Sequence, residues 1–380
     1  MKETEKGYRG SKSEILQTQS PKRVSVKEQR VDGSWFLAQQ ARNLRCTLMG
    51  GASYYQINNP SKQFKFYYST LNSDQNVQLN PYWLTGFSDA EGTFTIVIDK
   101  ITKRKLGWRI QSKFQISLHV RDLPLLLKIQ QNFGGIGSVS VSGDLAFYSV
   151  SSLKDLVKII IPHFLKYPLL HLRNEKQMLL TQKGADFLLF KQIVELMDNR
   201  AHLTIEGFNK IINIKAAMNL GLSDSFKSEF KDFIPVKRPL IQTDIIPDPY
   251  WITGFVDGEG TFDIKIYSSK TNVGFAVQLR FRIPQHDRDS KLIELILKYF
   301  GSGSVEKHTK HPAVTLVINK FITVTEKIIP FFESYPLVGV KKNDYLDWCN
   351  VAKLMNNKAH LTQEGLNLIK TIKSGMNSCR

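Results

Sequence analysis

The sequence predicts an α+β protein in which one domain is present twice. Four blocks of residues recur in the same order at a spacing of roughly 160 to 170 residues, which indicates a duplicated domain and not a short structural repeat. Within each copy, segments with helical spacing of apolar residues alternate with segments in which every second residue is apolar. Helices mixed with neighbouring antiparallel strands are typical of the α+β class.

The recurring blocks set the expected domain boundaries. They occupy residues 81–94 and 249–262, 111–122 and 278–289, 167–169 and 335–337, and 201–207 and 359–365. We therefore expect a first domain over 81–222, a linker rich in Lys, Asp and Pro over 223–247, and a second domain over 248–380. Residues 1–80 lie outside the repeat and are polar and weakly patterned, so we expect a poorly ordered N-terminal extension there.

Each copy begins with a predicted helix. Asn80 before Pro81, and Asp248 before Pro249, are typical of a helix start, because the polar side chain can cap the first turn and proline is tolerated at the first helical position. Strands are predicted next, over residues 93–98 and 261–266, and further helices over 123–133 and 291–300. Glycine-rich turns after these helices mark their ends.

Small residues share one face of the first helix in each copy. Gly86 and Ala90 are four residues apart, and Gly254 and Gly258 repeat the spacing in the second copy. Small residues at this spacing allow two helix backbones to approach closely. We therefore expect the two helices to pack against each other about a pseudo-twofold axis that relates the halves.

Glu91 and Glu259 end these two helices and would meet where the helices pack. Two carboxylates in close contact repel unless a proton or a cation lies between them. Oxygen ligands without nearby His or Cys favour Mg²⁺ over zinc, and such a site can activate water and stabilise a leaving phosphate oxygen. The alternative is a pair of solvated or capping acids, but their recurrence favours catalysis. Asp89 and Asp257 are expected to be structural.

The charge of the chain favours a polyanionic partner. Lys and Arg number 52 against 34 Asp and Glu, which gives a formal net charge of +18 and suits DNA, RNA or an anionic membrane. A membrane is the weakest of these, because no uninterrupted apolar run reaches the ~18 residues needed to span a bilayer. Cys46, Cys349 and Cys379 are far apart in the sequence and are expected to be reduced thiols.

The predicted strands present polar side chains on one face, because side chains alternate between the two faces of a strand. The outward positions are Thr93, Thr95, Val97, Asp99, Arg109, Gln111, Lys113 and Gln115 in the first copy and Thr261, Asp263, Lys265, Tyr267, Gln278, Arg280 and Arg282 in the second. Such side chains can read base edges in the major groove, where a β-ribbon fits. Lys103 and Arg104, at a hairpin tip, could reach phosphates. A solvated sheet face is the ordinary alternative, but four similar faces in a basic chain favour DNA.

The two glutamate-bearing helices resemble a known motif. Residues 84–92 (LTGFSDAEG) and 252–260 (ITGFVDGEG) look like two copies of the LAGLIDADG motif, each followed by a Thr-Phe strand. The whole chain resembles the single-chain homing endonucleases encoded in fungal mitochondrial introns. The resemblance implies two α-β-β-α-β-β-α domains related by pseudo-twofold symmetry, forming a DNA-binding saddle of two antiparallel sheets. It also implies a monomer and a mitochondrial location.

The resemblance further implies an activity. We expect site-specific cleavage of both strands of a long double-stranded DNA site, across the minor groove, leaving short 3′ overhangs. Two or three Mg²⁺ ions would lie at the domain interface, held by Glu91 and Glu259 with the backbone carbonyls of Ala90 and Gly258.

Three more catalytic residues are expected from the same resemblance. In the family, a polar residue near the position of Gln111 and Gln278 helps to organise metal-bound water, so both are placed in the catalytic site. A basic residue often follows the glycine-rich turn, near the scissile phosphates. Lys307 is the candidate in the second copy, and the first copy has no basic residue there.

Two other functions would share these features. An RNA maturase that binds its host intron and assists splicing would need the same basic surface, and so would a catalytically inactive DNA-binding protein. The endonuclease alone requires both Glu91 and Glu259, and their presence favours it. The histidines that recur in both copies, at positions 119 and 286 and at 202 and 360, are expected to have structural roles.

Overall fold

The computed structural model describes residues 78–103, 106–167, 181–240 and 245–377. Most of the expected N-terminal extension, together with Cys46, Arg104 and Cys379, lies outside the described residues. Cys349 is a half-buried free thiol. Within the described ranges, no helix is both long enough and apolar enough to cross a membrane.

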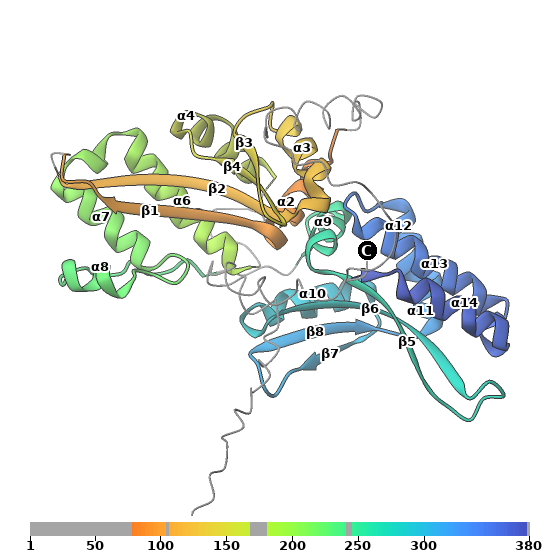
Figure 1. Cartoon of the computed structure of the whole chain (residues 1–380). Coiled ribbons are helices and arrows are strands. Elements are labelled where there is room, and N and C mark those ends of the chain that lie inside the picture. The colour runs from red at the N-terminus through yellow and green to blue at the C-terminus, as the bar shows by residue number, and fades with distance from the viewer. Residues whose placement is uncertain (1–77, 104–105, 168–180, 241–244, 378–380) are drawn as a thin grey trace, which may run out of the picture. The chain divides into compact units, whose positions relative to one another are not determined.

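The first half begins with a helix and two long strands and ends with several helices (Figure 1). Its elements are α2 (Pro81–Glu91), β1 (Gly92–Lys100), β2 (Trp108–His119), a 3-10 turn (Val120–Asp122), α3 (Leu123–Asn132), β3 (Ser138–Ser142), β4 (Leu145–Val150), α4 (Leu153–Asp155), a π-helical turn (Leu156–Ile160), α5 (Ile161–Lys166), α6 (Gln182–Asp198), a 3-10 turn (Ala201–Leu203), α7 (Ile205–Ala216) and α8 (Asp224–Glu229).

The second half repeats this order, without a counterpart of α8 among the described residues. Its elements are α9 (Pro249–Glu259), β5 (Thr261–Ser268), β6 (Phe275–His286), a 3-10 turn (Asp287–Asp289), α10 (Ser290–Phe300), β7 (Ser304–Lys307), β8 (Ala313–Ile318), α11 (Phe321–Thr323), a π-helical turn (Val324–Ile328), α12 (Ile329–Ser334), α13 (Lys341–Asn356), a 3-10 turn (Ala359–Leu361) and α14 (Gln363–Ser374).

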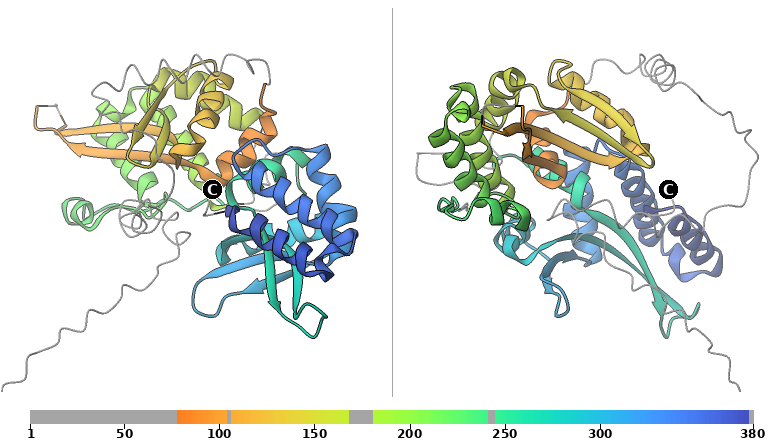
Figure 2. Two further views of the ribbon diagram at one scale, coloured as in Figure 1. Left: turned by 45° about the vertical axis from the view of Figure 1, so that its right-hand side comes forward. Right: turned by 60° about the vertical axis from the view of Figure 1, so that its left-hand side comes forward.

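Each half contains a four-stranded antiparallel sheet, with strand orders β1-β2-β4-β3 and β5-β6-β8-β7 in the described part of the chain. Helix α6 packs on β1 and β2, and α13 packs on β5 and β6. Figure 2 shows these helices over one face of their sheet from two further sides. The α+β class and the two antiparallel sheets are therefore confirmed. The expected α-β-β-α-β-β-α order has one helix after its fourth strand, whereas each half has several helices there.

The starts of α2 and α9 follow the capping pattern. The Asn80 side-chain oxygen accepts a hydrogen bond from the Tyr82 amide at 2.9 Å, and the Asp248 carboxylate accepts one from the Tyr250 amide at 2.8 Å. A proline opens each helix, where no amide hydrogen is needed. These two predictions are confirmed.

The alternation predicted for the strands is also confirmed. In β1 and β2 the side chains of Phe94, Ile96 and Phe114 are buried, whereas the residues between them are exposed or half-buried. Phe262 and Phe281 take the same positions in the second half. Each sheet therefore has one face in a hydrophobic core and the other open to solvent.

The segment expected to be a linker is fixed to the first half. Phe226 of α8 and Phe230, the residue directly after α8, pack on Trp108, with ring centroids 5.0 and 5.3 Å away. Arg238 then donates hydrogen bonds to the Gln182 carbonyl, to the Asp186 carboxylate and to the Ala217 carbonyl at 2.9, 2.7 and 2.8 Å. Apolar packing and a fully engaged guanidinium together hold this segment in place.

The tyrosine of the recurring Tyr-Pro block accepts a hydrogen bond from the middle of each LAGLIDADG-like helix. The Thr85 hydroxyl donates to the Tyr167 carbonyl at 2.9 Å, and Thr253 repeats the bond with the Tyr335 carbonyl at 3.0 Å. The two halves differ nearby, because His163 in the first half occupies the position of Phe331 in the second. Burial lowers the pKa of His163 to about 4.

The His163→Phe variant is expected to lose part of the acid sensitivity of the fold. His163 stays neutral in the folded protein, whereas in the unfolded chain it takes up a proton near pH 6.5. The free energy of unfolding therefore falls as the pH drops from about 6.5 to about 4, by roughly 2 kcal/mol between pH 7 and pH 5. Urea denaturation at these two pH values measures this loss.

The chain offers a reciprocal control for that measurement. Phe331→His introduces the imidazole into the equivalent environment of the second half, so it should add a similar loss between pH 7 and pH 5. Equal acid sensitivity in the wild type and the His163→Phe variant would contradict the assignment.

Candidate active site at the helix interface

Helices α2 and α9 pack with their backbones in direct contact. A Cβ atom built on Gly86 would lie 2.0 Å from the carbonyl oxygen of Trp251, and one built on Gly254 would lie 2.0 Å from that of Trp83. Real Cβ atoms do not approach an oxygen so closely, so both positions require glycine. The reciprocal contacts confirm that the two LAGLIDADG-like helices pair about a pseudo-twofold axis (Figure 1).

The pairing brings the acidic ends of the two helices together. A Cβ atom on Gly258 would lie 2.3 Å from the Ala90 Cβ and 3.3 Å from a carboxylate oxygen of Glu91. The Glu91 side chain therefore lies against the residue that directly precedes Glu259. The Glu259 side chain is buried, with 6% of its surface exposed. Glu91 and Glu259 thus both lie at the end of the helix interface.

Two lysines reach the carbonyl groups at the ends of these helices. Lys183, in the first turn of α6, donates to the Ala90 carbonyl at 2.6 Å. Lys341, at the start of α13, donates to the Gly258 carbonyl at 2.8 Å and to the Val256 carbonyl at 3.0 Å. A helix C-terminus carries partial negative charge, which a cation stabilises. The sequence analysis did not identify either lysine.

Asp89 and Asp257 are buried beside the carboxylates and make hydrogen bonds. Asp257 accepts from the Trp83 indole of the other half and from the Val338 amide, both at 2.8 Å, and Asp89 accepts from the Thr181 hydroxyl. Burial raises the pKa of Asp89 to about 7 and that of Asp257 to about 6, although these hydrogen bonds and nearby lysines oppose the rise.

The oxygen atoms at this interface suit a hard divalent cation. Two carboxylates and the carbonyls of Ala90 and Gly258 supply oxygen donors only, which is the ligand chemistry of Mg²⁺. The same two carbonyls already attract the ammonium groups of Lys183 and Lys341. Among the described residues, no three His, Cys, Asp or Glu side chains cluster as a metal-binding group, so main-chain oxygens would have to complete the set.

The open sheet faces carry ordered cationic side chains. Arg280 donates to the Asp263 carboxylate at 2.8 Å, and Arg282 forms an ion pair with the same carboxylate. In the first half Arg109 and Asp99 form another cross-strand pair at 2.7 Å, at a different position of the repeat. These pairs hold the guanidinium groups on the open face, which is the face predicted to contact DNA.

The strand register places two predicted catalytic residues away from the carboxylates. Gln111 pairs with Val97 and Gln278 pairs with Lys265, both well along strands that start one or two residues after the glutamates. At about 3.3 Å per residue, this is roughly 17 Å from Gly92 at the start of β1 and roughly 13 Å from Thr261 at the start of β5. Gln115 and Arg282, which pair with Thr93 and Thr261, are outward-facing residues of β2 and β6 that lie closer to that end.

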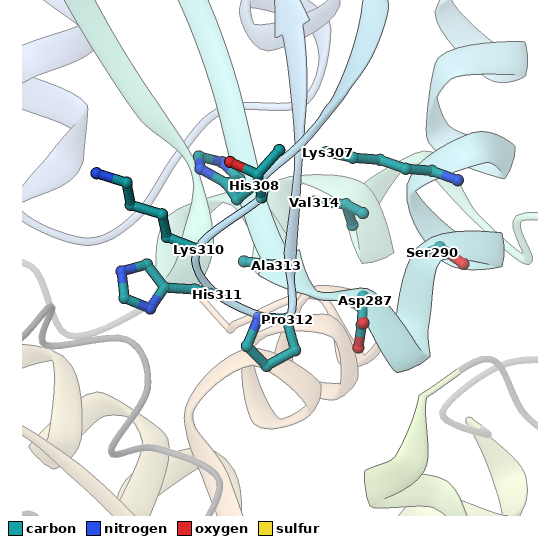
Figure 3. A pocket seen from close by; sticks show the side chains of 10 residues that line it. Asp287, Ser290, Lys307, His308, Lys310, His311, Pro312, Ala313 and Val314 are labelled. Carbon is teal, nitrogen blue, oxygen red and sulfur yellow. The ribbon is translucent and has the colours of Figure 1, made fainter.

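Lys307 lies on β7, where it pairs with Val314 of β8. It lines a cavity of about 590 Å³ together with Asp287, Ser290 and residues 308–314 of the β7–β8 turn (Figure 3). The ammonium groups at the ends of α2 and α9 belong to Lys183 and Lys341, and not to Lys307.

The recurring histidines have structural contacts. The His119 imidazole accepts a hydrogen bond from the Arg121 amide at 3.2 Å, and His286 accepts one from the Arg288 amide at 3.3 Å. The turns that contain His202 and His360 are held by threonine caps, and in each a following glycine touches the preceding alanine carbonyl. The contacts of His119 and His286 support the structural role expected for this pair.

The comparisons with known proteins agree with this geometry. The family model described as LAGLIDADG endonuclease matches residues 84–194 and again residues 252–352. The chain therefore belongs to the LAGLIDADG endonuclease family.

Individual relatives resemble most of the chain. The chain is 48% identical to probable intron-encoded endonuclease 3 of Neurospora crassa, and the match covers 98% of this chain and 70% of the relative. It is 38% identical to probable intron-encoded endonuclease 2 of the same fungus, and that match covers 78% of this chain and 65% of the relative. Among solved structures, it is similar to I-SmaMI bound to an uncleaved DNA target in the presence of calcium ions, with 42% identity, a TM-score of 0.75, and coverage of 79% of this chain and 99% of that chain.

Proposed function

We propose that this protein is a site-specific homing endonuclease that cuts both strands of a long DNA site with Mg²⁺ and leaves short 3′ overhangs. The observation that supports the proposal is the Glu91 side chain against Gly258, the neighbour of Glu259, at the end of the α2–α9 interface in a chain of net charge +18. The similarity to a structure of I-SmaMI on its DNA target supports DNA as the partner.

In this proposal Glu91 and Glu259 hold the divalent ions, with the carbonyls of Ala90 and Gly258 as further ligands. When bound, the ions supply an activated water and charge stabilisation for the leaving phosphate oxygen. The chain itself aligns the scissile phosphates, and its lysines add positive charge where negative charge builds up. We assign that role to Lys183 and Lys341 in place of Lys307, because they lie at the ends of α2 and α9.

The open sheet faces bind the duplex in this proposal. Arg109, Arg280 and Arg282 are held by carboxylates in positions from which they can reach base edges. We assign Gln111 and Gln278 to this face and not to the metal site, and their pairing with Val97 and Lys265, well along β1 and β5, supports this assignment. The remaining outward positions named in the sequence analysis complete the contact surface.

We further propose that the protein acts as a monomer with two domains, at 81–222 and 248–380. The pairing of α2 with α9 within one chain supplies the twofold arrangement that a separate subunit would otherwise provide. A mitochondrial location follows from the resemblance to enzymes encoded in fungal mitochondrial introns, and the relatives' names include the words intron-encoded.

Cleavage of the intronless form of the host gene tests the proposal. The purified full chain is expected to linearise a plasmid carrying the joined exons when Mg²⁺ is present, and to leave it intact in the presence of EDTA. A plasmid in which the intron interrupts the site is the matched control and should stay uncut. A chain that leaves the joined-exon plasmid intact, yet accelerates splicing of the host intron RNA, would replace the endonuclease proposal with the maturase alternative.

A further inference from the structure

A short turn recurs at the end of the second strand in each half. It reads His119-Val120-Arg121-Asp122 in the first half and His286-Asp287-Arg288-Asp289 in the second. In both, the imidazole Nδ1 accepts a hydrogen bond from the arginine amide, which closes a 3-10 turn. The closed turn sets the direction of the aspartate that follows.

These aspartates stand where a helix cap is expected but do not cap their own helix. Asp122 precedes α3 and Asp289 precedes α10, in the position whose side chain ordinarily accepts a hydrogen bond from the first turn. Neither side chain makes that bond.

Each aspartate instead bonds to the start of a helix in the other half. The Asp122 carboxylate accepts from the Val340 amide at 3.3 Å, directly before α13. The Asp289 carboxylate accepts from the Gln182 amide at 3.1 Å, the first residue of α6. The arrangement is reciprocal, because each half supplies one carboxylate and receives one.

The capped amide is next to the lysine of the site in both cases. Lys341 follows Val340 and donates to the Gly258 carbonyl, and Lys183 follows Gln182 and donates to the Ala90 carbonyl. Asp289 is buried, with 6% of its surface exposed, so solvent does not readily replace the bond that it makes.

We propose that Asp122 and Asp289 are positioning residues that form a reciprocal latch, in which each half fixes the lysine at the other half's catalytic carboxylate. This inference rests on the proposed endonuclease function. The latch makes each lysine depend on the docking of both halves, so neither half alone carries an ordered centre. Loss of one latch should therefore disturb one lysine and leave the other in place.

Strand-resolved cleavage by the full chain tests the latch. The substrate is the joined-exon DNA with a different label on each strand. Asp122→Ala is expected to slow the cutting of one strand by about tenfold to a hundredfold through misplacement of Lys341, with the other strand cut within about twofold of the wild-type rate. Asp289→Ala should slow the opposite strand, and both variants should accumulate nicked DNA without a rise in KM.

A matched control separates the latch from a general effect of losing a carboxylate. Asp144 is an exposed residue whose main-chain carbonyl contacts the first of these turns, and Asp144→Ala should cut both strands at the wild-type rate. Equal slowing of both strands in either latch variant, or unchanged cutting in both, would overturn the inference. If an alanine variant does not fold, Asp122→Ser and Asp289→Ser are read in the same way, because a serine side chain is too short to reach the other half.

Hydrogen exchange provides a readout that does not need cleavage. In the Asp122→Ala variant, the amides around Val340 should exchange at least about tenfold faster while those around Gln182 keep their wild-type rates, and Asp289→Ala should give the reverse. Unchanged exchange at both sites would refute the latch. If the wild type does not cut DNA but the exchange pattern appears, the proposed function fails and the latch stands.

Discussion

The Glu91→Gln and Glu259→Gln variants are each expected to lose the cutting of both DNA strands by about three orders of magnitude or more, because removal of one carboxylate ligand forfeits several kcal/mol of transition-state stabilisation. Both strands should be affected together. The Glu91 side chain lies against Gly258, next to Glu259, and in the proposed function the two carboxylates share one set of ions. Single-turnover cleavage of doubly labelled DNA with Mg²⁺ measures the loss.

DNA affinity should remain within about threefold of the wild type in these variants, because the proposed phosphate and base contacts come from the sheets and not from the carboxylates. Glu206→Gln and Glu364→Gln are matched controls, since these glutamates also recur in both halves but lie exposed in the first turns of α7 and α14. They should cut normally. Cleavage at the wild-type rate by either Glu91→Gln or Glu259→Gln would refute the site.

The Gly86→Ala and Gly254→Ala variants are expected to show the largest loss of stability, of the order of 3–5 kcal/mol each or a failure to fold. The added methyl group would lie 2.0 Å from a main-chain carbonyl oxygen of the other helix. A backbone atom cannot rotate away as a side chain can, so the two helices must separate along their length, and overpacking of this kind exceeds the usual cost of about 1–3 kcal/mol. Urea denaturation measures the change.

Gly375→Ala is the matched control for these variants. A Cβ atom there would meet one carbonyl oxygen at an ordinary 3.6 Å, and the residue needs no left-handed backbone. Its denaturation midpoint should stay close to that of the wild type. If the Gly86→Ala midpoint were equally unchanged, the close approach of α2 and α9 would be incorrect.

Most of the fold could be predicted because its signals are local and occur twice. The caps at Asn80 and Asp248 lie within three residues of the amides that they satisfy, and the strand alternation follows from burial on one face. The glycine spacing in α2 and α9 predicted a contact between halves, since a small-residue face has few other uses when it is present in two helices.

Lys183 and Lys341 were not predicted as site residues, because no sequence pattern near them links them to the ends of α2 and α9. Lys183 and the Ala90 carbonyl are 93 residues apart, and only the folded chain brings them together. A weaker signal was present: Lys183 precedes Asp186-Phe187 by the same spacing with which Lys341 precedes Asp344-Tyr345. The bonds of Asp122 and Asp289 to the other half could not be predicted for a similar reason. An aspartate directly before a helix is expected to accept a hydrogen bond from the first turn of that same helix.

The clamp around Arg238 determines where this enzyme could be recombined with a relative. Residues 223–240 connect the halves in sequence, yet through Phe226, Phe230 and Arg238 they are bound to the first half. A chimaera that takes a foreign second half should therefore keep the native chain up to residue 240. A junction placed at residue 223 would remove Phe226 and Phe230 from Trp108 and would leave the Asp186 carboxylate without the Arg238 guanidinium. The first half of such a chimaera should therefore be less stable than the native first half.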